Sequence, residues 1–271
     1  MKKILLITDM DGTLLPSNKI INPIDKIAVD RFLLDGNMFS IATGRSLPSA
    51  AQYFDKISIN GPVVLFNGGL IYDIKKDISV MKKFLSDKAF DIVTDIFANF
   101  SEIGGEIDLM DFTHVPKLNK SEEFHIKRSY KDDEYAQTAL SDIPRGEWMK
   151  VLFADEPEKI TELKKYIDTK NYTEVDFIPS SKTYFEMLPK GVSKGAALKW
   201  IINEYKLHNY LIVACGDYDN DLSMLKTADI AICPANALEC VKEVAHYVAK
   251  ASCNDGFIAE AIDFVLNKYK D

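Results

Sequence analysis

Two short acidic segments carry the residue types best suited to chemistry in this sequence. In DMDG, Asp9 and Asp11 follow directly on the apolar run ILLI. In GDYDND, three carboxylates follow the apolar run YLIVAC: Asp217, Asp219 and Asp221. Two such loops at one sheet edge would repel each other unless a cation lay between them. Oxygen ligands without a neighbouring histidine or thiolate suit Mg²⁺, so the two segments together favour a metal site over two ordinary acidic turns.

A lysine supplies the positive charge that a phosphate site needs. Lys194 lies in the first turn of the helix that SKGAALKWI predicts, with Ser193 as the N-cap. The helix macrodipole disfavours a cation there, and a bound phosphate would satisfy both the lysine and the helix N-terminus. Thr43 and Gly44 offer a hydroxyl and backbone N–H groups to the same anion. A surface lysine and a simple Thr-Gly turn are the alternatives.

The apolar runs before these segments predict the strands that position them. ILLI, MFSIA, VVLF, YLIVAC and IAIC are continuously hydrophobic, which is typical of parallel strands covered by helices on both faces. Ligands of such sheets bind beyond the carboxyl ends of the strands. The loops that begin at Asp9, Thr43, Asn67 and Asp217 should therefore converge on one crevice.

The first helix has clear sequence signals at both ends. Asn22 is the expected N-cap, Pro23 occupies the first helical position, and Asp25 stands at the capping-box position. Gly36 is expected to end the helix. Residues 4–42 are thus predicted to form a βαβ unit.

The middle of the chain follows a different pattern. NGGLIYD and ISVMKKF indicate a hairpin-like pair, after which helices and strands alternate with more charge. The runs SEEFHIKRSYKDDEY and ADEPEKITELKKYI are interpreted as solvated helix faces. We expect a discontinuous catalytic core, residues 1–83 and 186–271, and an inserted α+β domain, residues 84–185.

Composition narrows the function classes. The 271 residues carry a net charge of −8 with no basic stripe, which argues against nucleic-acid binding. No uncharged apolar stretch is long enough to span a membrane, and the N-terminal apolar run is too short for a secretory signal. The four cysteines lack metal-binding spacing and mostly lie among apolar residues. A cytoplasmic protein acting on a small molecule is expected.

The segments DMDGTLL, ATGR, SKGAAL and GDYDNDLSML occur in an order and spacing that resemble the four motifs of the haloacid dehalogenase-like superfamily, specifically the class IIB, Cof-type phosphatases. The resemblance covers both ends of the chain. It implies a doubly wound, Rossmann-like parallel-sheet core with an inserted α+β cap. It also implies Mg²⁺-dependent hydrolysis of phosphate monoesters, in the first place sugar phosphates.

The resemblance assigns a role to each matching residue. Asp9 would be the nucleophile and Asp11 the general acid/base, while Asp9, the backbone carbonyl of Asp11, and Asp217 would bind the metal. The phosphate would be held by Met10 through its amide, Thr43, Gly44, Lys194 and Asn220, with Gly12, Asn67, Gly68 and Asp221 supporting the site. ICPANA departs from the family's usual Gly-Asn-Ala run, so no role is carried over to Asn236.

Three other functions are compatible with parts of the pattern. GVSKG satisfies the G-x-S-x-G motif, which would make Ser193 the nucleophile of a serine hydrolase with His246 as base. A phosphosugar mutase would use the same aspartate, and a sensor would keep the site without turnover. In the inserted domain, His125 is expected at the surface, and at least one of Arg145, Trp148 and Lys150 is expected to be structural, while the others could face substrate.

Overall fold

The computed structural model describes residues 2–269, and the chain divides into two compact units. The first comprises the residues up to Gly44, Ala50–Met81, and the residues from Ser193 onward. The second comprises Lys82–Val192 together with Arg45–Ser49. By this division the inserted segment begins at Lys82 rather than at residue 84 and ends at Val192 rather than at residue 185.

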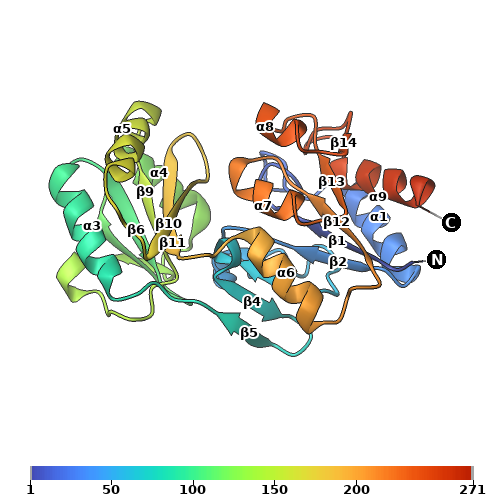
Figure 1. Ribbon diagram of the computed structural model, residues 1–271, viewed down its shortest axis with the longest axis horizontal. Helices are drawn as coiled ribbons and strands as arrows, with labels where there is room; N and C mark the ends of the chain where they lie inside the picture. The colour runs from blue at the N-terminus through green and yellow to red at the C-terminus, as the bar shows by residue number, and fades with distance from the viewer. Residues whose placement is uncertain (1, 270–271) are drawn as a thin grey trace. The chain divides into compact units, whose positions relative to one another are not determined.

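The first unit is built on a parallel sheet (Figure 1). Its strand order is β14-β13-β12-β1-β2, and every neighbouring pair is parallel. The strands are β1 (Ile4–Thr8), β2 (Met38–Ile41), β12 (Leu211–Cys215), β13 (Ile230–Cys233) and β14 (Tyr247–Val248). The predicted βαβ unit and doubly wound α/β core are confirmed.

Helices cover both faces of this sheet. They are α1 (Pro23–Leu34), α6 (Lys194–Glu204), α7 (Leu222–Leu225), α8 (Glu239–Lys242) and α9 (Phe257–Lys268), with short 3-10 turns η1 (Phe66–Gly68) and η3 (Asp219–Asp221). The short helix α2 (Leu47–Ala51) is divided between the two units. Residues of α6 and α7 share a core cluster with Leu5 and Ile7 of β1. The alternate residues Ile4 and Leu6 are equally buried, and α1 and α9 pack against each other beside the sheet (Figure 1).

The ends of α1 match the prediction except at one residue. The Asn22 side chain accepts a hydrogen bond from the Ile24 N–H, and Gly36 follows the helix with a φ of +79°. Asp25 does not form a capping box. Its buried carboxylate instead accepts a hydrogen bond from the Ala259 N–H in α9 at 2.8 Å, because it lies on the helix face packed against α9.

The run VVLF does not join the parallel sheet as a full strand. It forms β3 (Val63–Leu65) in a separate three-stranded sheet with β4 (Leu70–Asp73) and β5 (Ile78–Lys82), in the order β3-β4-β5. A single bridge between Ala42 and Val64 links β3 to the residue that follows β2. The predicted neighbouring pair of strands, β4 and β5, is present.

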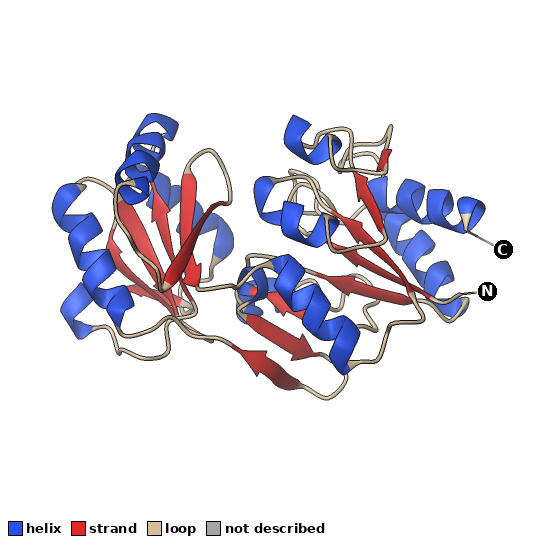
Figure 2. Ribbon diagram, viewed as in Figure 1, coloured by secondary structure: helices blue, strands red, loops and turns tan. Residues whose placement is uncertain are grey.

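The second unit contains a mixed sheet of order β10-β11-β9-β6-β7-β8 (Figure 2). Only the β7–β8 pair is parallel. Its strands are β6 (Gly104–Asp108), β7 (Thr113–Lys117), β8 (Tyr135–Gln137), β9 (Lys150–Ala154), β10 (Val175–Pro179) and β11 (Tyr184–Pro189). Its helices are α3 (Lys88–Asn99), α4 (Lys120–Ser129), α5 (Pro157–Asp168) and the 3-10 turn η2 (Leu140–Asp142).

The two faces of this second sheet differ in chemistry. Ile107 of β6 belongs to an apolar cluster that also holds residues of α3 and α5. Glu106 and Asp108 alternate with Ile107, so they point to the opposite face, which α4 covers. The interpretation of SEEFHIKRSYKDDEY as a solvated face was wrong at Glu122, which is fully buried in α4. None of the described helices combines the length and apolar character that a membrane crossing requires.

Candidate active site

Strand β1 ends at the residue that carries the first candidate carboxylate. The Asp9 N–H donates to the Cys215 carbonyl at 2.9 Å, which continues the β1–β12 pairing by one residue and fixes Asp9 at the sheet edge. The chain then turns, and the Leu15 N–H donates back to the Met10 carbonyl at 2.6 Å. Gly12 has a φ of +90°, and a Cβ there would lie 2.5 Å from Asp217 Oδ2. Glycine therefore lets the turn close against Asp217.

Strand β12 leads into the second acidic segment, where Asp221 organises the backbone. Its Oδ2 accepts hydrogen bonds from the N–H groups of Asp217 at 2.9 Å and Tyr218 at 3.1 Å. Its Oδ1 accepts from Lys194 Nζ at 2.7 Å. Asp221, which sequence analysis assigned only a supporting role, therefore holds the Asp217 loop and the lysine in place.

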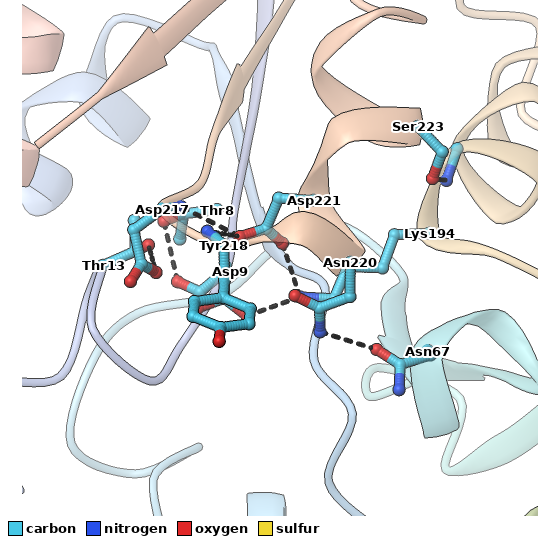
Figure 3. Close-up of polar contacts among 11 residues, drawn as sticks. Thr8, Asp9, Thr13, Asn67, Lys194, Asp217, Tyr218, Asn220, Asp221 and Ser223 are labelled. Atoms are coloured by element: carbon cyan, nitrogen blue, oxygen red, sulfur yellow. Dashed lines mark hydrogen bonds and ion pairs between the residues drawn. The ribbon is translucent and has the colours of Figure 1, made fainter. Parts of the chain in front are cut away.

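Lys194 lies at the start of α6 and is completely buried. Its Nζ contacts Asp9 Oδ1 at 2.5 Å and Asp221 Oδ1 at 2.7 Å (Figure 3). Burial opposes the charge on Lys194, but the two carboxylates outweigh burial and keep its pKa above the ordinary value. The lysine is therefore a fixed cation between the two acidic segments.

The carboxylate oxygens of Asp9, Asp217 and Asp221 converge within 4.8 Å of one another. Burial raises the pKa of Asp9 well above its ordinary value, and Asp221, Asp217 and Asp11 add to this effect against the opposing charge of Lys194. Burial and Asp221 likewise raise the pKa of Asp217 to about 7. Burial is the largest cause of both shifts, and repulsion from the neighbouring carboxylates adds to it.

The candidate phosphate-binding residues lie on adjoining loops. Asn67 accepts a hydrogen bond from Asn220 Nδ2 at 3.0 Å (Figure 3), and its N–H donates to the Thr43 carbonyl at 3.0 Å. A Cβ on Gly44 would lie 3.0 Å from Asn67 Nδ2. Gly68, with a φ of +109°, approaches so closely that a Cβ would lie 2.4 Å from the Ser193 carbonyl oxygen. Thus the loops after β2, β3 and β12 and the start of α6 meet at one place.

Comparison with known proteins identifies the family. The model of the haloacid dehalogenase-like hydrolases matches residues 6–262. The chain is 26% identical to a Bacillus subtilis 5-amino-6-(5-phospho-D-ribitylamino)uracil phosphatase, YwtE, with 96% of each chain covered. A haloacid dehalogenase-like hydrolase from Bacteroides thetaiotaomicron shares the fold with a TM-score of 0.84 at 20% identity, covering 97% of this chain and 100% of that one. A subclass IIB sugar phosphatase, BT4131, gives a TM-score of 0.80 at 20% identity, with 97% and 98% covered.

The chain belongs to the haloacid dehalogenase-like hydrolases. It is a hydrolase of this superfamily, as the order of its four motifs predicted, and it shares its fold with the subclass IIB sugar phosphatase BT4131. Apart from Arg45 of ATGR, the residues of the four motifs lie in the first unit of this haloacid dehalogenase-like hydrolase, where Asp9 and Asp221 contact Lys194.

The serine hydrolase alternative does not fit the geometry of this hydrolase. The Ser193 hydroxyl accepts a hydrogen bond from the Ala196 N–H at 3.1 Å, and its backbone is extended, with φ −163° and ψ 160°. Ser193 is thus an ordinary helix N-cap, as its position before α6 predicted, and not a strained nucleophile elbow. His246 uses its Nδ1 to accept from the Ala231 N–H at 2.9 Å, a structural role.

Three contacts at the site were not anticipated from the sequence. The Thr13 hydroxyl donates to Asp217 Oδ1 at 2.6 Å, and Lys19 forms an ion pair with Asp11. Asn236 donates to the Gly12 carbonyl at 2.8 Å, so it supports the turn even though ICPANA departs from the family pattern. Thr13 lies within the first motif, DMDGTLL, and could have been inferred. Lys19 lies outside every motif and carried no signal.

Proposed function

We propose that this protein is a Mg²⁺-dependent phosphatase of small phosphorylated metabolites, in the first place sugar phosphates, acting through an aspartyl phosphate on Asp9. The observation that carries the proposal is the convergence of the buried Asp9, Asp217 and Asp221 oxygens beside Lys194. Membership in a hydrolase family whose relatives are named phosphatases supports the same reaction class.

The donor set fits a magnesium ion. Oxygen ligands with no histidine or thiolate beside them suit a hard cation, and the raised pKa values of Asp9 and Asp217 reflect unneutralised charge that such a cation would remove. Asp9, Asp217 and the backbone carbonyl of Asp11 would hold it, with Asp221 orienting the loop. When bound, Mg²⁺ would offset negative charge on the transferring phosphoryl group.

The protein's own residues account for the remaining chemistry. Asp9 attacks phosphorus, the bond from phosphorus to the ester oxygen breaks, and Asp11 protonates the departing alcohol. Asp11 then removes a proton from water, which hydrolyses the aspartyl phosphate and regenerates Asp9. Lys194, the Met10 amide, Thr43 and Asn220 would hold the phosphoryl oxygens, and the Met10 N–H donates to no other group within residues 2–269.

The relatives suggest where to search for the substrate. YwtE is named as a phosphatase of a phosphoribityl compound, and BT4131 is named as a sugar phosphatase. Both names describe phosphate monoesters of polyhydroxylated carbon chains. We therefore propose hexose, pentose and alditol phosphates as the first substrate panel, with 5-amino-6-(5-phospho-D-ribitylamino)uracil included.

Phosphate release from this panel, measured with Mg²⁺ and after chelation, tests the proposal. Asp9→Asn should abolish release, whereas Ser193→Ala should lower stability by about 1 kcal/mol through loss of the N-cap and keep the activity. Activity that survives Asp9→Asn, or that ignores chelation, would overturn the mechanism. Phosphorus NMR would identify a mutase, because a mutase moves phosphate between positions of one sugar. Binding of a substrate without turnover would indicate the sensor.

A further inference from the structure

The loop between the first motif and α1 brings a lysine to the candidate acid/base. Lys19 Nζ forms an ion pair with Asp11 Oδ1, eight positions earlier in the chain. The two side chains are 34% and 39% exposed, so water screens the attraction and the pair adds little to the stability of the fold. The main consequence of the contact is therefore where it holds the Asp11 side chain.

The same loop keeps Lys19 in an unusual backbone conformation. Its φ is +61°, in the left-handed region that residues with a Cβ rarely adopt. The Lys19 N–H donates to the Pro16 carbonyl at 2.9 Å, which closes a turn. Ser17 donates through its N–H and its hydroxyl to Asn254 Oδ1, at 3.3 and 3.4 Å, which ties this turn to the loop before α9. Strained residues of this kind persist where the surroundings determine them, and they cluster at functional sites.

Asp11 has a fixed backbone and a side chain on the rim of the site. A bridge to Leu15 fixes the backbone. Its carboxylate is not among the three whose oxygens converge within 4.8 Å in the described part of the chain. A partly exposed aspartate can occupy several rotamers, and the ion pair selects those that bring Oδ1 to the Lys19 ammonium. Lys19 thus restricts the side chain where the backbone alone does not.

We propose that Lys19 is a positioning residue, which holds Asp11 in the orientation that proton transfer to the departing alcohol requires. The inference rests on the proposed function. The ammonium donates to Oδ1, so the proton that Asp11 delivers would be carried by Oδ2. When the bond from phosphorus to the ester oxygen breaks, its electron pair stays on that oxygen, which takes the Oδ2 proton. A misdirected carboxyl group slows this transfer.

The leaving group of the substrate tests the role of Lys19. The alcohol of a sugar phosphate departs poorly without a proton, whereas 4-nitrophenolate departs as a stable anion. Lys19→Met should therefore lower kcat/KM for the best sugar phosphate by at least about tenfold, and that for 4-nitrophenyl phosphate by less than about threefold. Lys19→Arg keeps a cation and should retain kcat/KM for the sugar phosphate within about threefold of the original.

Lys19→Gly separates positioning from a structural role. It removes the ammonium and relieves the left-handed strain at the same residue, because glycine adopts a positive φ without a steric penalty. It should lose activity on the sugar phosphate as much as Lys19→Met, while its urea unfolding midpoint is no lower than that of the original chain. A structural role would instead link the loss of activity to a loss of stability.

Lys76→Met is the matched control, because Lys76 forms another lysine–aspartate pair of the first unit, with Asp73 Oδ2 at 3.2 Å. It should change neither rate. Equal losses on the two substrates, an unchanged rate in Lys19→Met, or a Lys19→Arg variant as slow as Lys19→Met would overturn this inference alone. An original chain without phosphate release, or release that survives Asp9→Asn, would overturn the proposed function and this inference with it.

Discussion

Each unit of this protein buries a lysine between two carboxylates. In the Lys194 cluster (Asp9, Lys194, Asp217, Asp221), Nζ lies 2.5 and 2.7 Å from its partners. In the second unit, Lys150 Nζ lies 3.4 Å from Asp108 Oδ2 and 3.6 Å from Glu186 Oε1. All these groups are nearly or fully buried except Asp217, so both clusters carry the cost of removing charge from water.

In the Lys150 cluster (Glu106, Asp108, Glu122, Lys150, Glu186), protein donors reach some of the carboxylate oxygens, while Glu106 Oε2 and Asp108 Oδ2 are buried without a hydrogen bond. The Tyr130 hydroxyl lies 3.1 Å from both Glu106 and Asp108, and the Thr113 hydroxyl donates to Asp108 at 2.7 Å. His125 Nε2 approaches Glu106 Oε1 at 3.3 Å. It is therefore a partner in this cluster rather than the surface histidine expected from the sequence.

Glu122 contributes a further buried carboxyl group to the Lys150 cluster. Both of its carboxylate oxygens are buried without a donor. Burial and the charge of Glu106 raise the pKa of Glu122 well above its ordinary value. Conversely, His125, Lys150 and Glu122 together overcome burial and lower the pKa of Glu106 to about 2.

The Lys194 cluster differs in how its oxygens lie. Within residues 2–269, it alone brings ligand atoms of three acidic residues within 4.8 Å of one another. The contrast shows that a cluster of buried acidic residues is not by itself a metal site. The feature that distinguishes the two clusters is that oxygens of three carboxylates converge in the Lys194 cluster, whereas Tyr130 and His125 contact the carboxylates of the Lys150 cluster.

Substitutions in the two clusters should differ most in their effect on the rate of phosphate release. Asp9→Asn should reduce phosphate release by at least about 10⁴-fold, because it removes the nucleophile. Asp108→Asn is the matched change in the other cluster and should retain release within about tenfold, because Tyr130 and Lys150 still neutralise their neighbours. Steady-state phosphate release on the best substrate of the panel measures both. Comparable losses of phosphate release in the two variants would show that the two clusters do not differ in function.

Removing each lysine should destabilise its own unit. Lys194→Met and Lys150→Met each leave a buried carboxylate pair without its cation, which costs about 3 to 5 kcal/mol. The chain has two tryptophans, Trp200 in the first unit and Trp148 in the second, so single-tryptophan variants made with Phe report urea unfolding of each unit separately. A loss seen equally by both reporters would mean that the units unfold together.

Much of the Lys194 cluster could be predicted because its signals are local. Asp9 and Asp217 each follow a continuous apolar run, and such runs become parallel strands whose ends meet. The run VVLF carried the same signal but forms β3, because Asn67 and Phe66 take left-handed conformations that turn the chain back into β4. Periodicity does not encode that turn.

The Lys150 cluster could not be predicted because its members come from four separate elements. Glu106 and Asp108 lie on β6, Glu122 on α4, Lys150 on β9 and Glu186 on β11. Each one looks like a solvated charge in its own segment, and only the pairing of β6 with β9 and of β9 with β11 brings them together. Trp148, a possible substrate contact, is instead a buried core residue whose Nε1 donates to the Pro144 carbonyl at 2.6 Å.

Magnesium should stabilise only the unit that holds the Lys194 cluster. At about 100 times its dissociation constant, Mg²⁺ should add about 3 kcal/mol to the stability reported by Trp200 and much less to that reported by Trp148. Asp217→Asn should remove most of this gain, whereas Asp108→Asn should leave it intact. Thermal melts with and without chelator provide the measurement. An equal gain in Asp217→Asn would show that the ion binds elsewhere.

The smallest expected effect is the pH dependence of the stability of each unit in the absence of metal. It also compares the two clusters most directly. Burial raises the pKa of Asp108 to about 6, so its carboxyl stays protonated in the fold while it ionises in the unfolded chain. Stability of the second unit should therefore fall as pH rises from about 4 to 6, with Asp108 contributing on the order of 2 kcal/mol. Asp108→Asn should remove that contribution and leave the part that comes from the raised pKa of Glu122. Asp217 has a pKa of about 7, so the stability of the first unit should also fall as pH rises, up to about pH 7. Mg²⁺ should reduce the fall seen through Trp200 and leave that seen through Trp148, because only the converging oxygens have a cation still to gain. The part that remains through Trp200 comes from Asp25, whose pKa burial raises to about 6.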